Sequence, residues 1–252
     1  MKYVFGMATI PSRKKTLQKV LDTIIDHVDF GYLTLNNYDS VPKFLSESRY
    51  KKIHILRSQD ISDFKDGAKL YPMILLKEDV YYFCCDDDIL YPKTYFKYMA
   101  KRSDEKKSII SQYGYRLKEK KPLSVGFKES ITDKGTWYLG KRKQDVRVHF
   151  GGTGVMCINT KHYKIRDLKH FLNLYISDVG ADIWLATSCY RIGVPIICVK
   201  TSPDRAMLNK IPYNETIHNY LFKTQGDSKV DRINKKIITL INNVFFKGMI
   251  DV

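Results

Sequence analysis

The sequence predicts an α/β fold with a mixed, mostly parallel sheet flanked by helices. Short apolar, β-prone runs alternate with segments of helical periodicity, and this alternation is typical of parallel β-α-β units. The composition, with 44% hydrophobic and 28% charged residues in a chain of 252, is ordinary for a folded protein and argues against a disordered or fibrous one. No apolar run approaches the roughly 20 residues of a spanning helix, and the start lacks the order of a signal peptide. We therefore expect a single cytoplasmic domain.

The first half of the chain gives the clearest pattern. Strands are predicted over residues 3–10, 30–35, 53–56 and 80–85, with helices over 17–25 and 68–76. Because the carboxyl ends of parallel strands meet at one edge of a sheet, the segments after them are expected to form one ligand-binding rim. Those segments are Thr9 to Arg13, Asn36 to Asp39 and Asp86 to Asp88.

The second half is more basic and less regular. Strands are predicted over residues 155–158 and 194–199, and helices over 168–174, 183–190 and 230–244. Residues 101–147 carry 14 lysines and arginines against six acidic residues, half of the formal net charge of +16. This segment is interpreted as loops and short strands with a basic face, or as an ordinary solvated surface. The last helix either packs on its own domain or lies on an anionic inner membrane surface.

The five cysteines are predicted to be small core residues in a reducing compartment. Four of them stand in short apolar runs, and no metal-finger spacing is present. Adjacent residues of a strand point to opposite faces, so Cys84 and Cys85 are not expected to form a redox pair.

Three consecutive carboxylates, Asp86, Asp87 and Asp88, follow the apolar strand at 80–85. Like charges packed together repel each other unless a positive charge lies among them, and a divalent cation supplies one. Oxygen ligands without nearby cysteine or histidine favour Mn²⁺ or Mg²⁺. The alternative is an exposed acidic turn that caps the helix after Pro92.

Several motifs in a fixed order resemble glycosyltransferase family 2 and its relatives with the Rossmann-like GT-A fold. They are Ala8-Thr9-Ile10-Pro11-Ser12-Arg13, Asn36-Asn37-Tyr38-Asp39, Asp66-Gly67-Ala68-Lys69 and Cys85-Asp86-Asp87-Asp88-Ile89-Leu90-Tyr91-Pro92. The resemblance covers roughly residues 2 to 200. It implies a nucleotide-sugar-binding half over about 1–100, an acceptor-side half over about 101–200 and a basic helical extension over about 201–252.

The resemblance also implies an activity. A metal-dependent hexosyltransferase would move a sugar from a nucleoside-diphosphate sugar, UDP-linked, to a glycan or lipid-linked glycan acceptor of a surface polysaccharide. In the family pattern Thr9, Pro11 and Arg13 flank the base and ribose, and Asp39 contacts the base edge. Asp66 and Lys69 contact the nucleotide, with Lys69 alternatively at phosphate. Asp86 approaches the ribose, Asp87 accompanies it or faces away, and Asp88 binds the metal together with Asp86.

An inverting transfer needs a carboxylate base, and two residues are candidates. Asp182, in Asp182-Ile183-Trp184-Leu185, is preferred over Asp178 because it directly precedes an apolar helical face, as in the family motif. Either residue could instead be a helix N-cap. Some relatives complete the metal site with a late histidine, and His149 or His218 is the candidate here. Arg205 and Lys210, after the last predicted strand, could steady the diphosphate in a closing loop.

Two other functions fit parts of the sequence. The net charge and the 18 tyrosines would suit a nucleic-acid-binding protein, but no recognition motif is present and an acidic rim repels phosphates, so no nucleic-acid partner is expected. A nucleotidyltransferase of the same fold would carry a glycine-rich loop after its first strand. The segment from Ala8 to Arg13 contains no glycine, which favours glycosyl transfer.

Overall fold

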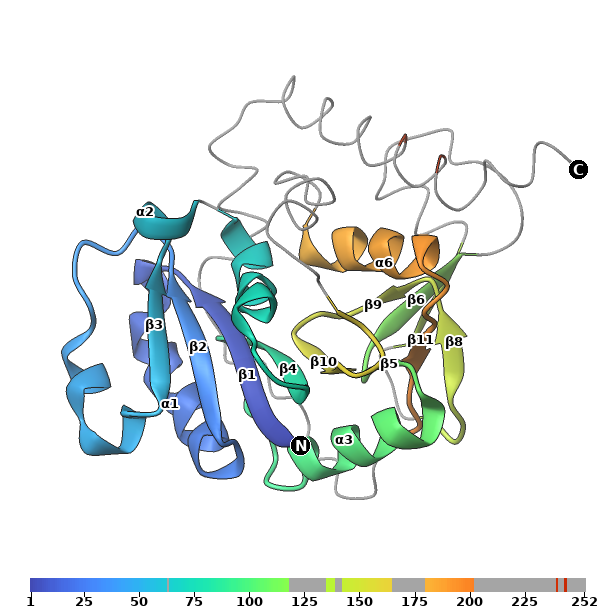
Figure 1. The fold of residues 1–252 in the computed structure, drawn as a ribbon, viewed down its shortest axis with the longest axis horizontal. Coiled ribbons are helices and arrows are strands. Elements are labelled where there is room, and N and C mark those ends of the chain that lie inside the picture. The colour runs from blue at the N-terminus through green and yellow to red at the C-terminus, as the bar shows by residue number, and fades with distance from the viewer. Residues whose placement is uncertain are drawn as a thin grey trace, which may run out of the picture.

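The computed structural model describes residues 1–62, 64–117, 135–138, 142–164 and 180–201 and the single positions 239 and 243. A mixed eight-stranded sheet forms its centre. The strand order is β3-β2-β1-β4-β10-β5-β11-β8, and β7-β6-β9 form a second, smaller sheet (Figure 1). The strands are β1 (Lys2–Thr9), β2 (Phe30–Leu35), β3 (Ile53–Arg57), β4 (Val80–Asp86), β5 (Ile109–Ser111), β6 (Gly114–Leu117), β7 (Gly135–Tyr138), β8 (Val146–Val148), β9 (Phe150–Gly151), β10 (Val155–Asn159) and β11 (Ile196–Cys198).

Helices and short 3-10 segments connect these strands. The α-helices are α1 (Lys14–Ile24), α2 (Ser58–Ile61), α3 (Tyr95–Lys106) and α6 (Ala181–Arg191). The 3-10 segments are η1 (Pro11–Arg13), η2 (Ile25–His27), η3 (Lys43–Ser46), η4 (Ser48–Tyr50), η5 (Lys65–Lys69) and η6 (Tyr71–Leu75). Among the described residues, none of the helices is long and apolar enough to cross a bilayer.

The sheet has the mixed, mostly parallel character that the sequence predicts. Strands β3, β2, β1 and β4 pair in parallel, and β5 pairs in parallel with β11. Strand β10 runs antiparallel between β4 and β5, and β8 is antiparallel to β11. The predicted strands over 3–10, 30–35, 53–56, 80–85 and 155–158 correspond to β1, β2, β3, β4 and β10, and the predicted helix over 183–190 lies within α6. The helices predicted over 168–174 and 230–244 lie outside the described residues.

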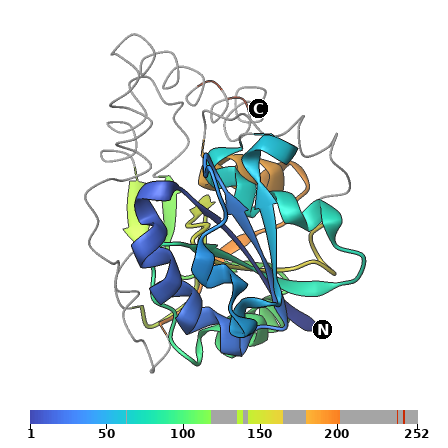
Figure 2. The same cartoon turned by 90° about the vertical axis from the view of Figure 1, so that its left-hand side faces the viewer.

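Each face of the sheet has its own apolar core, because successive strand residues point to opposite faces. On β1, Phe5 and Met7 join the core under α1 and α3, whereas Val4 and Ala8 join the core under α6. Figure 1 shows α3 and α6 on opposite sides of the strands, and Figure 2 shows α1 alongside the N-terminal strands. All five cysteines are buried free thiols, which confirms their prediction as core residues.

The helix predicted over residues 68–76 is instead two 3-10 segments, η5 and η6. Two backbone carbonyls that an α-helix would use bond to the sheet: Thr34 Oγ1 donates to Ala68 O at 3.3 Å, and the Tyr82 hydroxyl donates to Lys69 O at 2.6 Å. Pro72 has no N–H to donate to the carbonyl four residues earlier. Tertiary hydrogen bonds and this proline therefore override the helical periodicity.

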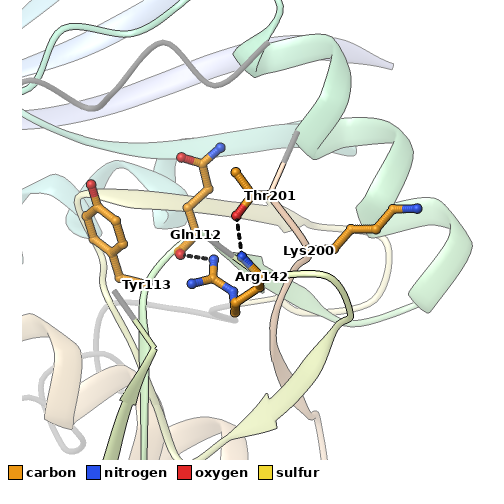
Figure 3. Close-up of a pocket in the computed structure, with 5 residues that line it drawn as sticks. All are labelled: Gln112, Tyr113, Arg142, Lys200 and Thr201. Carbon is orange, nitrogen blue, oxygen red and sulfur yellow. Dashed lines mark hydrogen bonds between the residues drawn. The ribbon is translucent and has the colours of Figure 1, made fainter. Parts of the chain in front are cut away.

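Arg142 connects the segment before β8 to the end of β11 through hydrogen bonds. Its backbone N–H donates to Thr201 Oγ1 at 2.8 Å, its Nε donates to Val199 O at 3.1 Å, and its guanidinium also donates to Gln112 O (Figure 3). The cavity beside it has a volume of about 10 Å³, which is the space of roughly one water molecule. Arg142 therefore has a structural role.

Gly6 permits the closest approach within the sheet, and its replacement tests the packing. A Cβ at Gly6 would lie 1.8 Å from the Tyr82 hydroxyl oxygen and 2.3 Å from Lys69 O, whereas one at Gly152 would meet nothing nearer than 3.3 Å. Urea unfolding should show that Gly6→Ala lowers the free energy of unfolding by about 1–3 kcal/mol or more, with a smaller effect of Gly152→Ala. Equal losses in both variants would contradict this packing.

Candidate active site

The carboxyl ends of β1 and β4 mark the place where the chain changes direction across the sheet. From β1 the chain passes outward to β2 and β3, and it then returns to the other side of β1 as β4. Ala8 lies opposite Asp86 in the parallel register, and Asn36 N donates to Thr9 O at 2.9 Å. The three segments expected at one rim therefore follow strands that end at the same edge. Open α/β sheets bind their ligands at such a switch point.

Lys69 carries a buried positive charge at this edge. The residue is 5% exposed, and its Nζ donates to Asp86 Oδ1 at 2.5 Å. The backbone of Lys69 is fixed against β4 by the bond from the Tyr82 hydroxyl. Gly6 gives this backbone the space it needs. The ammonium group is thus positioned by the sheet rather than by a free loop.

The pKa of Lys69 reflects two opposing effects. Burial lowers the pKa because it removes the ammonium from water, but surrounding carboxylates outweigh that effect and leave the pKa above its ordinary value. These carboxylates are Asp86, Asp66 and Asp182. Asp66 belongs to η5, as Lys69 does, whereas Asp86 belongs to β4 and Asp182 to α6, so the cation links its own segment to two other elements.

Arg13 supplies a second buried cation to the acidic cluster. The residue is 4% exposed; its guanidinium donates to Asp87 Oδ1 and lies 3.9 Å from Asp88 Oδ2. Burial raises the pKa of Asp87 to about 6, although Arg13 and the Thr9 hydroxyl favour the ionised form. The family pattern places Arg13 beside the base and ribose, and in this structure its guanidinium pairs with the acidic cluster.

Asp86 and Asp88 are the two carboxylates that could offer oxygen ligands to a divalent cation. Asp88 is 5% exposed, and the Asp86 side chain is 35% exposed. Within the described residues no group of three metal-ligating side chains is present. Two carboxylates nevertheless fit Mn²⁺ or Mg²⁺, because such ions complete their coordination with water and substrate phosphates. Since Lys69 and Arg13 already offset part of the acidic charge, these residues suit an ion that arrives together with a diphosphate.

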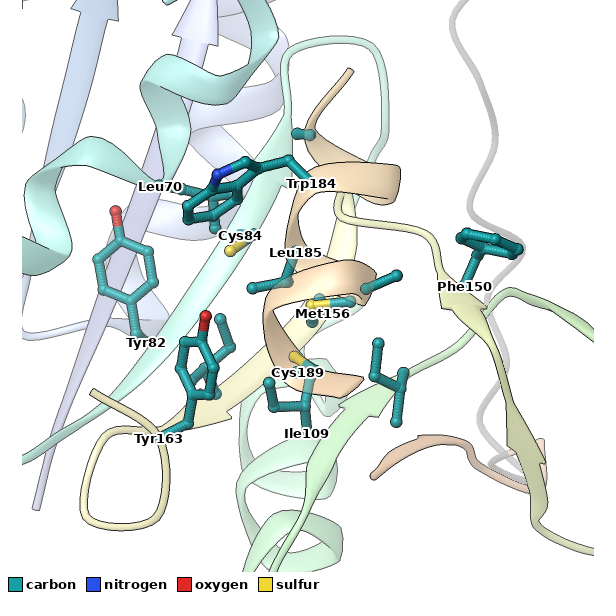
Figure 4. Packing of buried hydrophobic residues seen from close by; sticks show 14 of the residues in the cluster. Leu70, Tyr82, Cys84, Ile109, Phe150, Met156, Tyr163, Trp184, Leu185 and Cys189 are labelled. Carbon is teal, nitrogen blue, oxygen red and sulfur yellow. The ribbon is translucent and has the colours of Figure 1, made fainter. Parts of the chain in front are cut away.

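The first turn of α6 is fixed on two sides. Ala181 N donates to Asp66 Oδ2 at 2.9 Å, and Gly180 enters the helix with a φ of +83°, a conformation that favours glycine. Trp184 and Leu185 are fully buried in the core under α6, as Figure 4 shows. Burial of this face of the helix leaves Asp182 on an accessible side.

Thr153 fixes the orientation of the Asp182 carboxylate. Its Oδ1 accepts hydrogen bonds from Thr153 N at 2.8 Å and from Thr153 Oγ1 at 2.5 Å. Among the described residues nothing donates to its Oδ2, and the residue is exposed. The carboxylate is therefore held in a defined orientation through Oδ1.

The surroundings of Asp182 favour its protonated form. Burial raises the pKa of this carboxyl above the ordinary 3.8, against the opposing effects of Lys69 and of the Thr153 hydrogen bonds. Protein thus surrounds the group closely even though solvent still reaches the residue. A carboxylate with a raised pKa is a stronger base, and proton transfer is most efficient when the pKa approaches the working pH.

Tyr91 and Gly154 join the acidic cluster to the strand that follows the glycine-rich turn. The Tyr91 hydroxyl accepts a hydrogen bond from Asp86 N at 2.8 Å and donates one to Gly154 O at 2.5 Å. A Cβ at Gly154 would lie 1.9 Å from Asp86 Oδ2, so only glycine permits this approach. Sequence reasoning gave Tyr91 no role, although its place three residues after Asp88, within the same motif, was a signal.

The remaining candidates from the sequence lie in varied surroundings. Thr9 is buried, with its Oγ1 3.4 Å from the Tyr38 hydroxyl, whereas Pro11 and Asp39 are exposed. His149 Nδ1 accepts a hydrogen bond from Leu117 N at 2.9 Å, and His149 forms no metal-ligand group with the described aspartates. Four candidates lie outside the described residues: Asp178, Arg205, Lys210 and His218.

The arrangement has two chemical parts that meet at one edge of the sheet. Asp86 and Asp88, with the cation of Lys69, could hold a metal-bound or free anionic group, and Asp182 could accept a proton from a neighbouring hydroxyl. Lys69 interacts electrostatically with Asp86 of the first part and with Asp182 of the second, so both parts lie around one positive charge. No protein-family model matches this sequence, and no curated protein matches it.

Proposed function

We propose that this chain is a glycosyltransferase of the inverting type. It would move a sugar from a nucleoside-diphosphate sugar, UDP-linked, to a hydroxyl of a growing surface polysaccharide or glycolipid. The observation that carries the proposal is the carboxylate of Asp182, which Thr153 fixes through Oδ1, which accepts nothing at Oδ2 from the described residues, and which interacts with the same cation, Lys69, as Asp86 does. A base next to a diphosphate-binding edge is what an inverting transfer requires.

The donor side of the proposed reaction uses the acidic cluster. Asp86 and Asp88 would hold Mn²⁺ or Mg²⁺ together with the diphosphate, and the bound ion supplies Lewis-acid stabilisation of the leaving group. Lys69 is buried and fixed by the sheet, so it offers a preorganised positive charge beside the diphosphate. The Tyr91 and Gly154 contacts keep Asp86 in place during the reaction.

The acceptor side uses Asp182. The acceptor oxygen forms a bond to the anomeric carbon while the bond from that carbon to the diphosphate oxygen breaks, and the acceptor proton passes to Asp182 Oδ2. The diphosphate leaves with the electron pair of the broken bond. Attack from the side opposite the leaving group inverts the configuration of the sugar. The two hydrogen bonds from Thr153 hold the carboxylate still while it accepts the proton.

The charge of the chain supports an anionic partner. A net charge of +16 favours association with phosphate-bearing molecules and with anionic lipid surfaces. A lipid-linked glycan presented at the inner face of a membrane combines both. This acceptor and the peripheral location at the membrane are part of the proposal.

The first test addresses the donor site. Calorimetry with Mn²⁺ present should show UDP binding that becomes at least about tenfold weaker in Asp88→Ala, because the substitution removes an ion ligand. Asp60→Ala, at an exposed aspartate of α2, is the control with the same loss of charge and should bind as the unmodified protein does. Undiminished UDP binding in Asp88→Ala would remove the metal from the proposal.

The second test addresses the base. In Asp182→Asn the amide oxygen can still accept both Thr153 bonds, so nucleotide affinity should be kept while kcat falls by about 10²–10⁴-fold. In the unmodified enzyme kcat should rise with pH as Asp182 loses its proton, with a midpoint above 3.8, and this rise should disappear in the variant. Full activity of Asp182→Asn, or loss of activity in Asp178→Asn alone, would reject Asp182 as the base.

The third test addresses the contact between the turn and the acidic cluster. Gly154→Ala should displace the Asp86 carboxylate, because the new Cβ would overlap its Oδ2. UDP affinity in the presence of Mn²⁺ should therefore fall, whereas Gly152→Ala, two residues away, where the nearest atom to a new Cβ is Tyr113 Cβ at 3.3 Å and no aspartate is displaced, should keep it. A comparable affinity in both variants would show that Asp86 does not contribute to donor binding.

A further inference from the structure

A second hollow lies at the far end of α6, with a volume of about 350 Å³. Its basic side chains come from the two sheets: Arg116 of β6, Arg147 of β8, and His149. Its apolar side chains come from α6 and from the segment that leads into β11, and they include Ala186, Val194 and Ile196. Figure 1 shows α6 beside β6, β8 and β11. The hollow is therefore both cationic and apolar.

No described residue compensates the charge of the two arginines of this hollow. Both are exposed, and within the described part of the chain neither forms an ion pair or a hydrogen bond through its guanidinium. Two guanidinium groups beside one hollow repel each other unless an anion lies between them. Arginine also presents paired N–H donors that match the oxygens of a phosphate or carboxylate.

His149 shows that the two arginines of the hollow lie close to one ring. Its Nδ1 accepts the hydrogen bond from Leu117 N, which fixes the imidazole against β6. Burial, Arg116 and Arg147 all lower the pKa of His149, and both arginines are therefore close enough to act on the ring.

The size of the hollow indicates what it would take. A volume of about 350 Å³ is within the range of small-ligand pockets and exceeds what a bare inorganic anion would fill. Neither Asp182 nor Lys69 nor any aspartate of the acidic cluster lines the hollow. The hollow is thus distinct from the site at the start of the helix.

We propose that this hollow is a binding site for an organic anion, a phosphate or carboxylate group attached to an apolar or ring-shaped body. The anionic group would lie between Arg116 and Arg147, and the body would contact Ala186, Val194 and Ile196. This assignment does not depend on the proposed glycosyl transfer, because neither the acidic cluster nor Asp182 takes part in it.

The test measures binding directly, without metal or nucleotide. Calorimetry at low salt should detect phenyl phosphate binding to the unmodified protein and at least about tenfold weaker binding to the double variant Arg116→Gln/Arg147→Gln. Arg191→Gln removes the same charge from an exposed arginine of α6 that does not line the hollow, and it should bind as the unmodified protein does. Asp88→Ala should also bind normally, which separates this site from the donor site.

Two companion ligands examine the two features of the hollow separately. Inorganic phosphate should bind more weakly than phenyl phosphate, because it leaves the apolar side chains without a contact, and neutral phenol should bind more weakly because it lacks the charge. Equal affinity for inorganic phosphate would overturn the apolar part of the assignment. Phenyl phosphate binding that is unchanged in the double variant, or lost equally in Arg191→Gln, would overturn the site itself.

Discussion

The buried ammonium of Lys69 is the interaction on which the candidate active site depends. It lies against Asp86 of β4 and interacts with Asp66 of its own segment and with Asp182 of α6, so it offsets the negative charge of acidic groups from three elements. Removing one partner of a buried ion pair is strongly destabilising, because the other charge is then left uncompensated in a poorly solvated place. The acidic edge of the sheet and the start of α6 therefore both contribute to compensating the buried charge of Lys69.

The carboxylates of Asp86 and Asp182 have different surroundings, and these surroundings suit them to different roles. Asp86 is paired with Lys69, whereas burial raises the pKa of Asp182, whose Oδ1 accepts two hydrogen bonds from Thr153. Different surroundings for neighbouring acidic groups are a usual way for one site to hold both a permanently charged group and a proton acceptor. Both surroundings here are produced by backbone groups and fixed side chains, so the site is organised before any ligand binds.

Much of the sheet could be predicted from the sequence, since its central strands are buried on both faces and appear as continuous apolar runs. The edge shared by β1, β2 and β4 followed from strand order alone. The antiparallel direction of β10 could not be predicted, because the periodicity of side chains is the same in either direction. The cations at the acidic cluster were also missed: the sequence argument assigned compensation to a metal, whereas Arg13 and Lys69 meet the aspartates from 74 and 17 residues away.

The position of β10 has a consequence for the folding of the newly made chain. Strand β4 is a strongly apolar strand and is synthesised about 70 residues before β10. Until β10 is added, one side of β4 presents unpaired backbone groups next to apolar side chains, which makes a template for association with other chains. A ribosome-bound or truncated chain that ends before Val155 would therefore be prone to aggregate, even though all three aspartates of the acidic cluster would already be present.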